Sequence, residues 1–590
     1  MFSGKVIKKL KIKMRNDLDT KAKYNKFNKK LMVTQILVFF LFLSLAGYLF
    51  YRQIFDTKSY RVKAKRQRSA LSLVMRGQIL DRNGIKLASD MTTYKVYAIT
   101  RDYDHAISEL ATKLAPVLNM SYSKLTQLLK KNQPVILLKK DLDKKTATRV
   151  RKLGLREISV EQQNDRTYPQ GQMLAHVLGY YNAEADVSSG IEYTCRDKLE
   201  KADKRVEFEK TPNGNIIYNL NTDPLATTTP ASGENVTLTI DTAIQHVCET
   251  ELNKVVKEKQ AARGFAMVMD PKNGEILAYA VNPTYNPNQY KQASALSLKN
   301  WSLTDIFPPG STFKILTVAT AIELGLLNEN SLVNDTGKVK IGSWEIKNYD
   351  YYKNPNPGMI DLVYYFEHSS NVGSVKIAQM IPKQQYYNQL RRFGFGSKTG
   401  IDLPGESVGL LPKYTNWDAA MQASMGYGYG ASVTAIQMVH AVSAIANDGI
   451  AVTPHVIKYK DAELEEKVKR REVVKSETAQ ALKRILTKSI NNSKGPLNLP
   501  QYTVAAKTGT SRKPMEKQKG YSNQLYTSVI GFLPADNPKV LIYVVVDSPK
   551  GEAIWGSTVA APIFREIALQ TARIMNIPPD KNISNDNKTN

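Results

Sequence analysis

The chain has 590 residues, of which 42% are hydrophobic and 23% charged, and its formal net charge is +28. This length exceeds what one hydrophobic core supports, so two or more domains are expected, and two cysteines are too few for a disulfide-rich scaffold. The charge favours anionic partners, but eleven Lys and Arg stand in residues 1–30, beside an apolar stretch, which argues for lipid headgroups rather than nucleic acid.

A membrane-spanning helix is the first predicted element, at residues 31–51. This stretch has no charged residue, and 21 helical residues span roughly 30 Å, the hydrocarbon thickness of a bilayer. A cleaved signal peptide would have a shorter apolar core and a small-residue cleavage site, which leaves a buried helix of a soluble domain as the alternative. The basic tail at 1–30 then predicts a cytoplasmic N-terminus and an extracytoplasmic body, anchored by this single pass.

Residues 52–235 are predicted to form an extracytoplasmic domain of short helices and strands. It begins with a basic stalk at 52–75, and Asp81–Gly84 and Thr211–Gly214 are typical of turns. No arrangement of residues in it indicates chemistry, so we interpret it as a pedestal. Six histidines are scattered without metal-ligand spacing, and the sequence requires neither a metal site nor a bond between Cys195 and Cys248.

The pattern changes near residue 236, where we expect a second α+β domain that extends to residue 577. An alternating strand is predicted at Asn235–Asp241 and a helix from Thr242 to about Lys259. A hairpin is predicted from two apolar runs on either side of a turn, Phe265–Met269 and Ile276–Val281. Three further strands are predicted near the other end of the domain, at Tyr502–Ala506, Tyr526–Leu533 and Val540–Asp547. A helix-rich stretch at about 311–490 separates the two groups of strands. The pattern predicts one antiparallel sheet built from both ends of the domain, followed by a disordered polar tail at 578–590.

Three short motifs in this domain carry the candidate chemistry, but each occurs twice in the chain. Ser-x-x-Lys begins at Ser311 and at Ser121, Ser-x-Asn at Ser369 and at Ser489, and Lys-Thr-Gly at Lys507 and at Lys398. Ser121 opens a Leu- and Lys-rich helix that we expect on the surface, and Lys398 precedes a loop sequence. Because serine is a common helix cap, a purely structural role for Ser311 stays open at this point.

The surroundings of Ser311 favour a nucleophile. Pro308–Gly310 predicts a turn and Thr312–Thr320 a helix, so Ser311 and Lys314 share one face of the first turn. The free N–H groups and the dipole of this helix end disfavour an ammonium, so a partly buried Lys314 would be neutral enough to take the proton of Ser311.

The other two motifs supply polar groups to the same chemistry. The loop at 369–371 would present a hydroxyl and an amide. Lys507 follows an apolar strand, where backbone groups and hydroxyls can bind the backbone and carboxylate of a substrate, and its ammonium adds a positive charge.

The three motifs, in the order Ser311, Ser369, Lys507, resemble those of the penicillin-recognising acyl-serine enzymes. Further segments are similar to class B penicillin-binding proteins, and the resemblance extends from about residue 55 to 575: Arg76–Gly84, Arg166–Pro169, His176–Gly179, Gly190–Glu192, Gly426–Gly430, Thr434, Gln437 and Gly531–Asp536. It implies a β-lactamase-like transpeptidase domain with an antiparallel sheet and a helical lobe at 236–577. That domain would stand on an elongated α+β pedestal of the dimerisation type at 52–235, which follows one transmembrane helix.

For function, the resemblance implies a membrane-anchored peptidoglycan D,D-transpeptidase that cross-links stem peptides ending in D-Ala-D-Ala, binds β-lactams and needs no cofactor. Ser311 would attack the penultimate carbonyl and Lys314 would act as base, although the base is disputed across the wider family. Ser369 would relay the proton to the leaving amine, and Asn371 would hold the substrate amide.

The resemblance also implies roles for the residues of the Lys507 motif. Lys507 would set the electrostatic field around Ser369. The substrate-binding residues would be Thr508, Gly509 and Thr510, whose threonines would bind the terminal carboxylate. The backbone N–H groups of Ser311 and Thr510 would form the oxyanion hole, in which each donor is typically worth a few kcal/mol.

Partners and alternatives also follow from the resemblance. No glycosyltransferase-like segment precedes the pedestal, so a polytopic membrane glycosyltransferase and other wall-synthesis proteins are expected partners, with anionic wall polymers nearby. The sequence of His368–Gly373 slightly favours a role in septal division. The absence of C-terminal repeats weakens the assignment to septal division rather than to side-wall elongation. The alternatives are a D,D-carboxypeptidase or β-lactamase-type hydrolase on the same scaffold, and a non-catalytic cell-wall scaffold.

Overall fold

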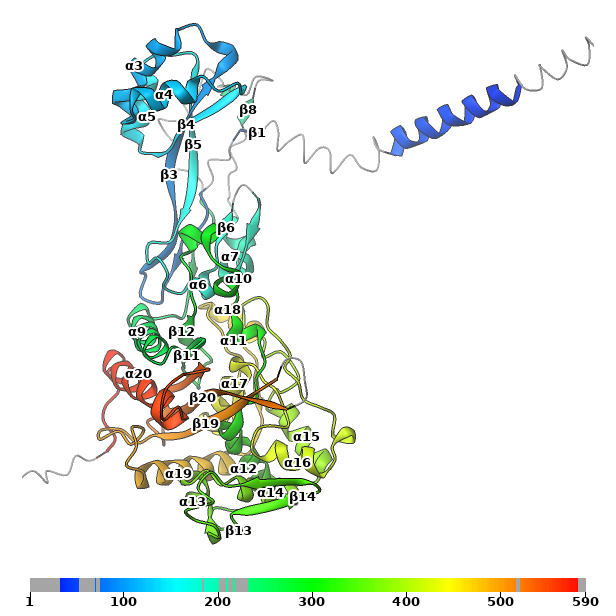
Figure 1. Ribbon diagram of the computed structural model, residues 1–590, viewed down its shortest axis with the longest axis vertical. Coiled ribbons are helices and arrows are strands. Elements are labelled where there is room, and N and C mark those ends of the chain that lie inside the picture. The colour runs from blue at the N-terminus through cyan, green and yellow to red at the C-terminus, as the bar shows by residue number, and fades with distance from the viewer. Residues whose placement is uncertain are drawn as a thin grey trace, which may run out of the picture. The chain divides into compact units, whose positions relative to one another are not determined.

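The computed structural model (Figure 1) describes residues 32–51, 69–70, 75–182, 185–200, 208–210, 216–217, 232–515 and 520–581. The chain divides into two compact units, Met1–Leu73 with Lys204–Thr229, and Val74–Asp203 with Pro230–Asn590. The predicted basic tail, most of the predicted stalk, the predicted turn at 211–214 and residues 582–590 lie outside the described residues.

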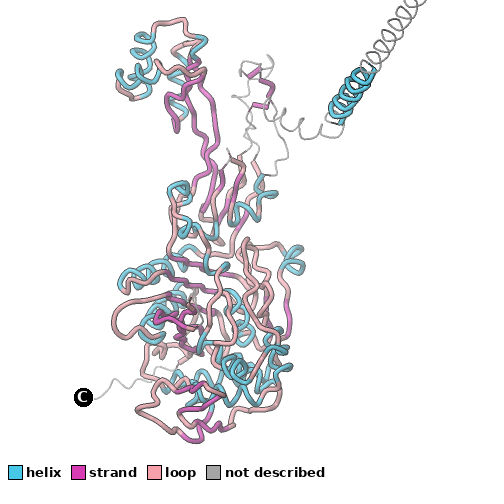
Figure 2. The backbone as a smooth tube through the Cα atoms, turned by 45° about the vertical axis from the view of Figure 1, so that its right-hand side comes forward, coloured by secondary structure: helices cyan, strands magenta, loops and turns pink. Residues whose placement is uncertain are grey.

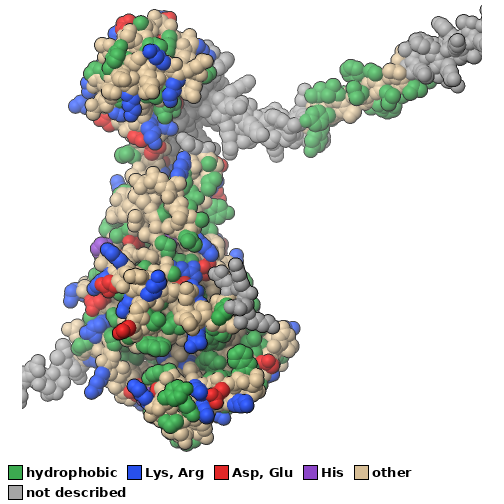
Figure 3. All heavy atoms as spheres, in the orientation of Figure 1, with side chains coloured by type: hydrophobic (Ala, Val, Ile, Leu, Met, Phe, Trp, Pro, Cys, Tyr) green, Lys and Arg blue, Asp and Glu red, His purple; other side chains and the backbone are tan. Residues whose placement is uncertain are grey.

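The first unit contains the helix Met32–Tyr51, which is long and apolar enough to cross a membrane. Its apolar side chains are exposed along its length (Figure 3). Lipid rather than water suits such a surface, so the helix fits the span predicted at 31–51. The unit also contains a small sheet of β1 (Ser69–Ala70), β8 (Phe208–Lys210) and β9 (Ile216–Ile217).

The second unit begins with a sheet centred on β3 (Lys86–Ile99). The sheet also contains β2 (Ile79–Leu80), β4 (Val135–Leu142), β5 (Ile158–Thr167) and β10 (Val236–Thr237). β3 pairs antiparallel with β2, β4 and β5, and β10 joins parallel to β2. Three helices lie beside β3 and β4 (Figure 2): α3 (Ile107–Leu118), α4 (Tyr122–Leu129) and α5 (Lys144–Lys152). Their buried apolar side chains form one cluster with those of the two strands.

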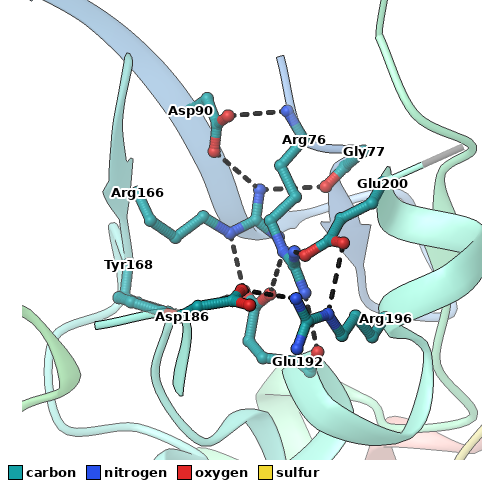
Figure 4. Close-up of polar contacts among 9 residues, drawn as sticks. All are labelled: Arg76, Gly77, Asp90, Arg166, Tyr168, Asp186, Glu192, Arg196 and Glu200. Atoms are coloured by element: carbon teal, nitrogen blue, oxygen red, sulfur yellow. Dashed lines mark hydrogen bonds and ion pairs between the residues drawn. The ribbon is translucent and has the colours of Figure 1, made fainter. Parts of the chain in front are cut away.

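Buried ion pairs tie this first sheet to α7 (Gly190–Thr194), as Figure 4 shows. Glu192 has no exposed side-chain surface and accepts hydrogen bonds from Arg76 Nε at 2.7 Å and from Arg166 Nε at 2.6 Å. Arg166 also contacts Asp90 at 3.1 Å and the carbonyl of Gly77 at 2.9 Å. Charges this deep are tolerated only when paired and hydrogen-bonded, so these residues fix the packing of four separate segments.

The larger sheet of the second unit has the strand order β12-β11-β21-β20-β19. Its strands are β11 (Arg263–Met269), β12 (Ile276–Asn282), β19 (Ala505–Pro514), β20 (Tyr521–Leu533) and β21 (Val540–Asp547), all antiparallel. The predicted hairpin and the predicted sheet from both ends of the domain are thus confirmed. Side chains of β11 point alternately to the two faces of the sheet and enter a hydrophobic core on each. One core lies under α9 (Thr242–Glu258) and α20 (Ala561–Ile574), and the other lies under α12 (Lys314–Glu323) and α17 (Ala435–Ala446).

Three predicted elements differ from the structure. The strand expected at Asn235–Asp241 shrinks to β10, because beyond it the backbone changes partners: Leu238 bridges to Ile457, and Asp241 N donates to Leu277 O at 2.9 Å. The strand expected at Tyr502–Ala506 starts at Ala505 instead and runs through the Lys507 motif as β19. Asp580 and Lys581, expected in the tail, hydrogen-bond to residues 498–503.

The stretch expected to be helix-rich also contains three pairs of short strands, one of which is β17 (Ile450–Val452) with β18 (Arg470–Glu472). β13 (Leu332–Asp335) pairs with β16 (Gly358–Asp361), and β14 (Lys338–Ile341) pairs with β15 (Trp344–Lys347). The helices around them include α13 (Leu362–Glu367), α14 (Asn371–Met380), α15 (Lys383–Arg392), α16 (Ala419–Gly426) and α19 (Ser476–Asn492). The smaller elements are α6 (Ala175–Leu178), β6 (Tyr181–Asn182), β7 (Val187–Ser188), α8 (Arg196–Glu200), α10 (Ala295–Leu298), α11 (Trp301–Thr304), β17 (Ile450–Val452), α18 (Asp461–Lys467) and β18 (Arg470–Glu472).

Candidate active site

Ser311 lies inside a tight turn, not at the cap of a helix. The turn η3 (Gly310–Phe313) is a 3-10 helix that leads directly into α12, and neither element has a side-chain cap hydrogen bond. The helix predicted from Thr312 therefore starts two residues later, and Phe313 occupies its cap position. A capping role for Ser311 does not agree with this geometry, which leaves its hydroxyl for another task.

Close packing on two sides shapes this turn. Gly310 has a φ of +59°, and a Cβ placed there would lie 2.9 Å from the Cβ of Ser511 on β19. On the other side Gly310 N donates to Gly428 O at 3.1 Å, and a Cβ on Gly428 would lie 2.2 Å from Gly310 O. Glycine at both positions lets β19 and the 426–430 segment approach the backbone beside Ser311.

Lys314, the first residue of α12, is fully buried. Its Nζ donates to Ser369 O at 2.6 Å and to Asn371 Oδ1 at 2.9 Å, and lies 3.2 Å from Ser369 Oγ. Burial lowers the pKa of Lys314 well below its usual range, Lys507 lowers it further, and Asp335 opposes both. The structure thus joins the first two predicted motifs through an amine that loses its proton easily.

Ser369 has an unusual backbone conformation for a residue with a side chain. Its φ is +51°, in the left-handed region, which costs about 1 kcal/mol for a non-glycine residue. It stands between α13 and α14, and the next residue, Ser370, caps α14 by accepting from Gly373 N at 2.7 Å. Such a conformation persists only where the surroundings enforce it, and it is typical of functional loops.

Two residues that the motifs did not reveal hold this loop. Asp335 accepts from Ser370 Oγ at 2.6 Å, and its two carboxylate oxygens accept from Asn348 Nδ2 at 2.9 and 2.8 Å. Asn348 Oδ1 accepts from the backbone N–H of Asn371 at 2.9 Å. The alternating residues around Gly342 were a hairpin signal that could have located this region, but no sequence pattern shows which buried side chains meet.

The Lys507 motif lies on β19, at the edge of the sheet. Burial lowers the pKa of Lys507 to about 7, and its Nζ donates to Thr508 O at 3.1 Å. Thr510 Oγ1 accepts from Gly556 N at 3.0 Å, and a Cβ on Gly509 would lie 2.9 Å from Thr312 Cγ2. Because β19 has no strand on its outer side in the described chain, alternate backbone groups there face away from β20.

The second copies of the motifs have structural roles. Ser121 caps α4, and both it and Lys124 are exposed. Thr399, after Lys398, donates to Glu406 at 2.7 Å within a loop, as predicted. Ser489 is buried inside α19, and its hydroxyl donates to the carbonyl of Leu486.

The site therefore combines groups suited to attack on the carbonyl of an extended peptide. It brings together a serine in a tight turn, an amine of low pKa, a second serine hydroxyl and an edge strand. A neutral amine accepts the proton of a nucleophile, and an edge strand pairs with an extended ligand. Within the part of the chain that the structure describes, no group of His, Cys, Asp and Glu side chains is placed to hold a metal ion.

Family models match most of the chain. The penicillin binding protein transpeptidase domain matches residues 264–569, and the penicillin-binding protein dimerisation domain matches residues 72–238.

Individual proteins are also similar to this chain over most of its length. Stage V sporulation protein D of Bacillus subtilis (strain 168) is 31% identical, over 86% of this chain and 79% of the relative. A probable peptidoglycan D,D-transpeptidase PenA of Neisseria gonorrhoeae is 30% identical, over 86% of this chain and 85% of the relative. The crystal structure of Penicillin Binding Protein 2X from Streptococcus thermophilus has a TM-score of 0.71 and 25% identity, and covers 88% of this chain and 82% of the other.

Proposed function

The chain belongs to the class B penicillin-binding proteins, and is a peptidoglycan D,D-transpeptidase of cell-wall synthesis; on this basis we propose that Ser311 is its acyl nucleophile. Enzymes of this family are serine acyltransferases that act on peptidoglycan stem peptides and bind β-lactams. The observation that carries the proposal is the contact of Lys314 Nζ with the Ser369–Asn371 loop, one turn after Ser311.

Lys314 is the proposed general base. A neutral amine has two N–H donors and one lone pair, and Ser369 O and Asn371 Oδ1 accept from both donors. The lone pair then accepts the proton of Ser311 as Oγ attacks the penultimate D-Ala carbonyl. The C–N bond breaks, D-alanine leaves with the proton delivered through Ser369 Oγ, and the acyl group stays on Ser311 as an ester. An amine of a second stem peptide then displaces Ser311 Oγ and forms the cross-link.

The remaining predicted residues bind the donor peptide in this proposal. Asn371 donates one N–H to Lys347 O at 3.0 Å, so its second N–H is the one that holds the substrate amide. In its protonated form, which predominates below its pKa of about 7, Lys507 supplies a positive field beside Ser369. On β19, Thr508, Gly509 and Thr510 form the edge along which the peptide lies, and the hydroxyl protons of Thr508 and Thr510 bind its terminal carboxylate. The N–H groups of Ser311 and Thr510 form the oxyanion hole.

The domain limits and the location of the protein are also proposals. They comprise a cytoplasmic tail at 1–30, a span at 31–51, a pedestal at 52–235, a transpeptidase domain at 236–577 and a tail at 578–590. The exposed apolar helix Met32–Tyr51 and the basic residues before it support single-pass anchoring with an extracytoplasmic active site. Partnership with a polytopic glycosyltransferase, and septal division over elongation, rest on the family resemblance alone.

The decisive experiment is acylation by a fluorescent penicillin, with the full chain purified in detergent. We expect one covalent label per molecule on the wild type and none on Ser311→Ala. Ser121→Ala is the matched control, because it removes the serine of the second Ser-x-x-Lys copy and should label like the wild type. An unlabelled wild type, or a labelled Ser311→Ala, would sink the proposal.

The lifetime of the label tests the hydrolase alternative. The transpeptidase proposal requires slow hydrolysis of the acyl ester, so the label should persist for hours. Loss within minutes would favour a carboxypeptidase or β-lactamase instead. A Ser311→Ala allele that supports normal growth would favour the non-catalytic scaffold.

A further inference from the structure

Asp335 is a buried carboxylate that no catalytic motif contains. It ends β13, its side chain has no exposed surface, and four hydrogen bonds reach it. The donors are Ser370 Oγ at 2.6 Å, Asn348 Nδ2 at 2.8 and 2.9 Å to the two oxygens, and Gly337 N at 2.8 Å. A carboxylate buried with this many donors holds each of them in place, since moving any donor leaves part of a buried charge unpaired.

These bonds continue directly into the loop that contacts Lys314. Asn348, oriented by Asp335, accepts from Asn371 N at 2.9 Å and from Val372 N at 3.1 Å. Ser370, also oriented by Asp335, accepts from Gly373 N at 2.7 Å. The first turn of α14 is therefore anchored to a single carboxylate on a different element.

The loop has reason to need such an anchor. Ser369 keeps a left-handed backbone with φ +51°, and its carbonyl and hydroxyl oxygens lie 2.6 and 3.2 Å from Lys314 Nζ. A residue with a side chain leaves that conformation unless its neighbours are fixed. The anchored residues, Ser370 and Asn371, are the two that follow it.

We propose that Asp335 is a positioning residue for acyl transfer, which sets Ser369 and Asn371 against Lys314 through its hydrogen bonds to Ser370 and Asn348. The proposal rests on the proposed roles of Ser311 and Lys314. It adds that these roles depend on a carboxylate that touches neither the substrate nor the nucleophile.

The charge of Asp335 also acts on Lys314. Among the described residues, the charged side chains that shift the pKa of Lys314 are Lys507 on β19, which lowers it, and Asp335 on β13, which raises it. Removing the negative charge should lower the pKa of Lys314 further. The base would then lose its proton at a lower pH, and the acidic limb of the acylation profile would move down.

The test compares two variants of the full chain in detergent. Asp335→Asn keeps the shape of the side chain but turns an N–H group toward the amide of Asn348, so two donors meet. Adding Asn348→Asp restores the pairing in reverse, because the carboxylate introduced at position 348 can accept from the amide introduced at position 335 and from the N–H groups of Asn371 and Val372. Asp402→Asn is the matched control, since the partly buried carboxylate of Asp402 also accepts from two backbone N–H groups, those of Val456 and Ile457, in a separate loop.

The readout is the rate of labelling by a fluorescent penicillin against its concentration, from pH 5 to pH 10, with the melting temperature alongside. For Asp335→Asn we expect a rate at saturation at least tenfold below wild type, a half-saturating concentration changed less than threefold, and an acidic limb at lower pH. The double variant should recover the rate to within threefold of wild type. Asp402→Asn should label at the wild-type rate per folded molecule, whatever its melting temperature.

The outcomes separate the hypotheses. A folded Asp335→Asn that labels at the wild-type rate overturns the positioning role and leaves the proposed function intact. If the single variant does not fold, the double variant decides: wild-type labelling supports the inference, and tenfold slower labelling of the folded protein overturns it. An unlabelled wild type would instead reject the nucleophile itself.

Discussion

At the scale of single residues, the site is unusual in holding two buried amines. The hydrogen bonds of Lys314 and Lys507 go to uncharged oxygens of Ser369, Asn371 and Thr508. Lys483 offers a contrast in the same domain, since it is also buried but has the carboxylate of Asp448 at 2.6 Å. Burial without a counter-charge favours the neutral amine, which is the state that proton acceptance requires.

Lys507 should therefore make stability depend on pH. Its folded pKa is about 7, against roughly 10.4 for an unfolded lysine, so between these values the unfolded chain binds the extra proton. Stability then rises with pH through this window, by up to about 1.4 kcal/mol per pH unit, and is flat for this group below it. We expect the difference in unfolding free energy between wild type and Lys507→Met to grow in favour of wild type from pH 7 to pH 10, measured by urea denaturation.

The control for that measurement is Lys483→Met, whose amine has a carboxylate partner. Like Lys507→Met, it removes a buried amine, so it shows how much of the pH dependence comes from replacing any buried lysine of this domain. A pH-independent difference for Lys507→Met would contradict a depressed pKa for Lys507.

At the scale of elements, close backbone approach places the serine turn between β19 and the 426–430 segment. Gly428 has a φ of +82°, and a Cβ there would lie 2.2 Å from Gly310 O. The atom in the way belongs to the backbone, which cannot move aside as the end of a flexible side chain can. A methyl group at Gly428 must therefore displace η3. The position of Ser311 is therefore determined by its neighbours as much as by its own turn.

Gly428→Ala should slow acylation strongly. We expect labelling by the fluorescent penicillin at least 100-fold slower than wild type, because displaced reacting groups lose their alignment. Gly325→Ala is the matched control: Gly325 has a φ of +71° but nothing within 4 Å of where a Cβ would stand, so the variant bears the backbone cost of about 1 kcal/mol alone. It should melt earlier than wild type yet label at the wild-type rate, and equal losses in both variants would refute the packing argument.

Elements also show what the sequence could and could not predict. The strands of the larger sheet were predictable because long apolar runs such as Val540–Asp547 are buried on both faces. β13–β16 were not, since strands of four residues, in which buried and exposed positions are mixed, give only a short signal within a helix-rich stretch. Asp335 and Asn348 were missed for a further reason: a buried hydrogen-bond network depends on the tertiary fold, and its members follow no spacing in the chain.

At the scale of the whole molecule, side-chain hydrogen bonds join the residues of the dimerisation match, 72–238, to residues that follow it. The Asp81 carboxylate accepts a hydrogen bond from Thr242 Oγ1 at 2.8 Å, at the start of α9. The side chain of Asn288 forms two hydrogen bonds with the backbone of Tyr168: Oδ1 accepts from its N–H and Nδ2 donates to its carbonyl, both at 2.9 Å. Nearby, Glu192 forms ion pairs with both Arg76 and Arg166 (Figure 4). Fold stability should depend on this cluster although it contains no catalytic motif.

Glu192→Gln should destabilise the protein markedly. It leaves two buried guanidinium groups without their shared carboxylate, and breaking a buried pair typically costs about 3–5 kcal/mol. Glu109→Gln is the control, because Glu109 forms an exposed pair with Lys113 one turn away, where water already solvates both charges and the pair adds little to stability. Chemical denaturation should separate the two variants clearly, and a loss for Glu192→Gln no larger than that for Glu109→Gln would show that the cluster is not structural.

The pairing of β11 with β21 has a consequence for how the protein is made. Arg263 on β11 contacts Asp547 on β21, 284 positions later, so the middle of the larger sheet closes only after Asp547 has been synthesised. A ribosome that has finished Ser311 has not yet made β19, against which the serine turn packs. A nascent or truncated chain therefore exposes an unpaired edge of β11 and is prone to degradation or aggregation. Such a chain also has no acyl-transfer activity. The enzyme becomes active only once β19, β20 and β21 have been synthesised.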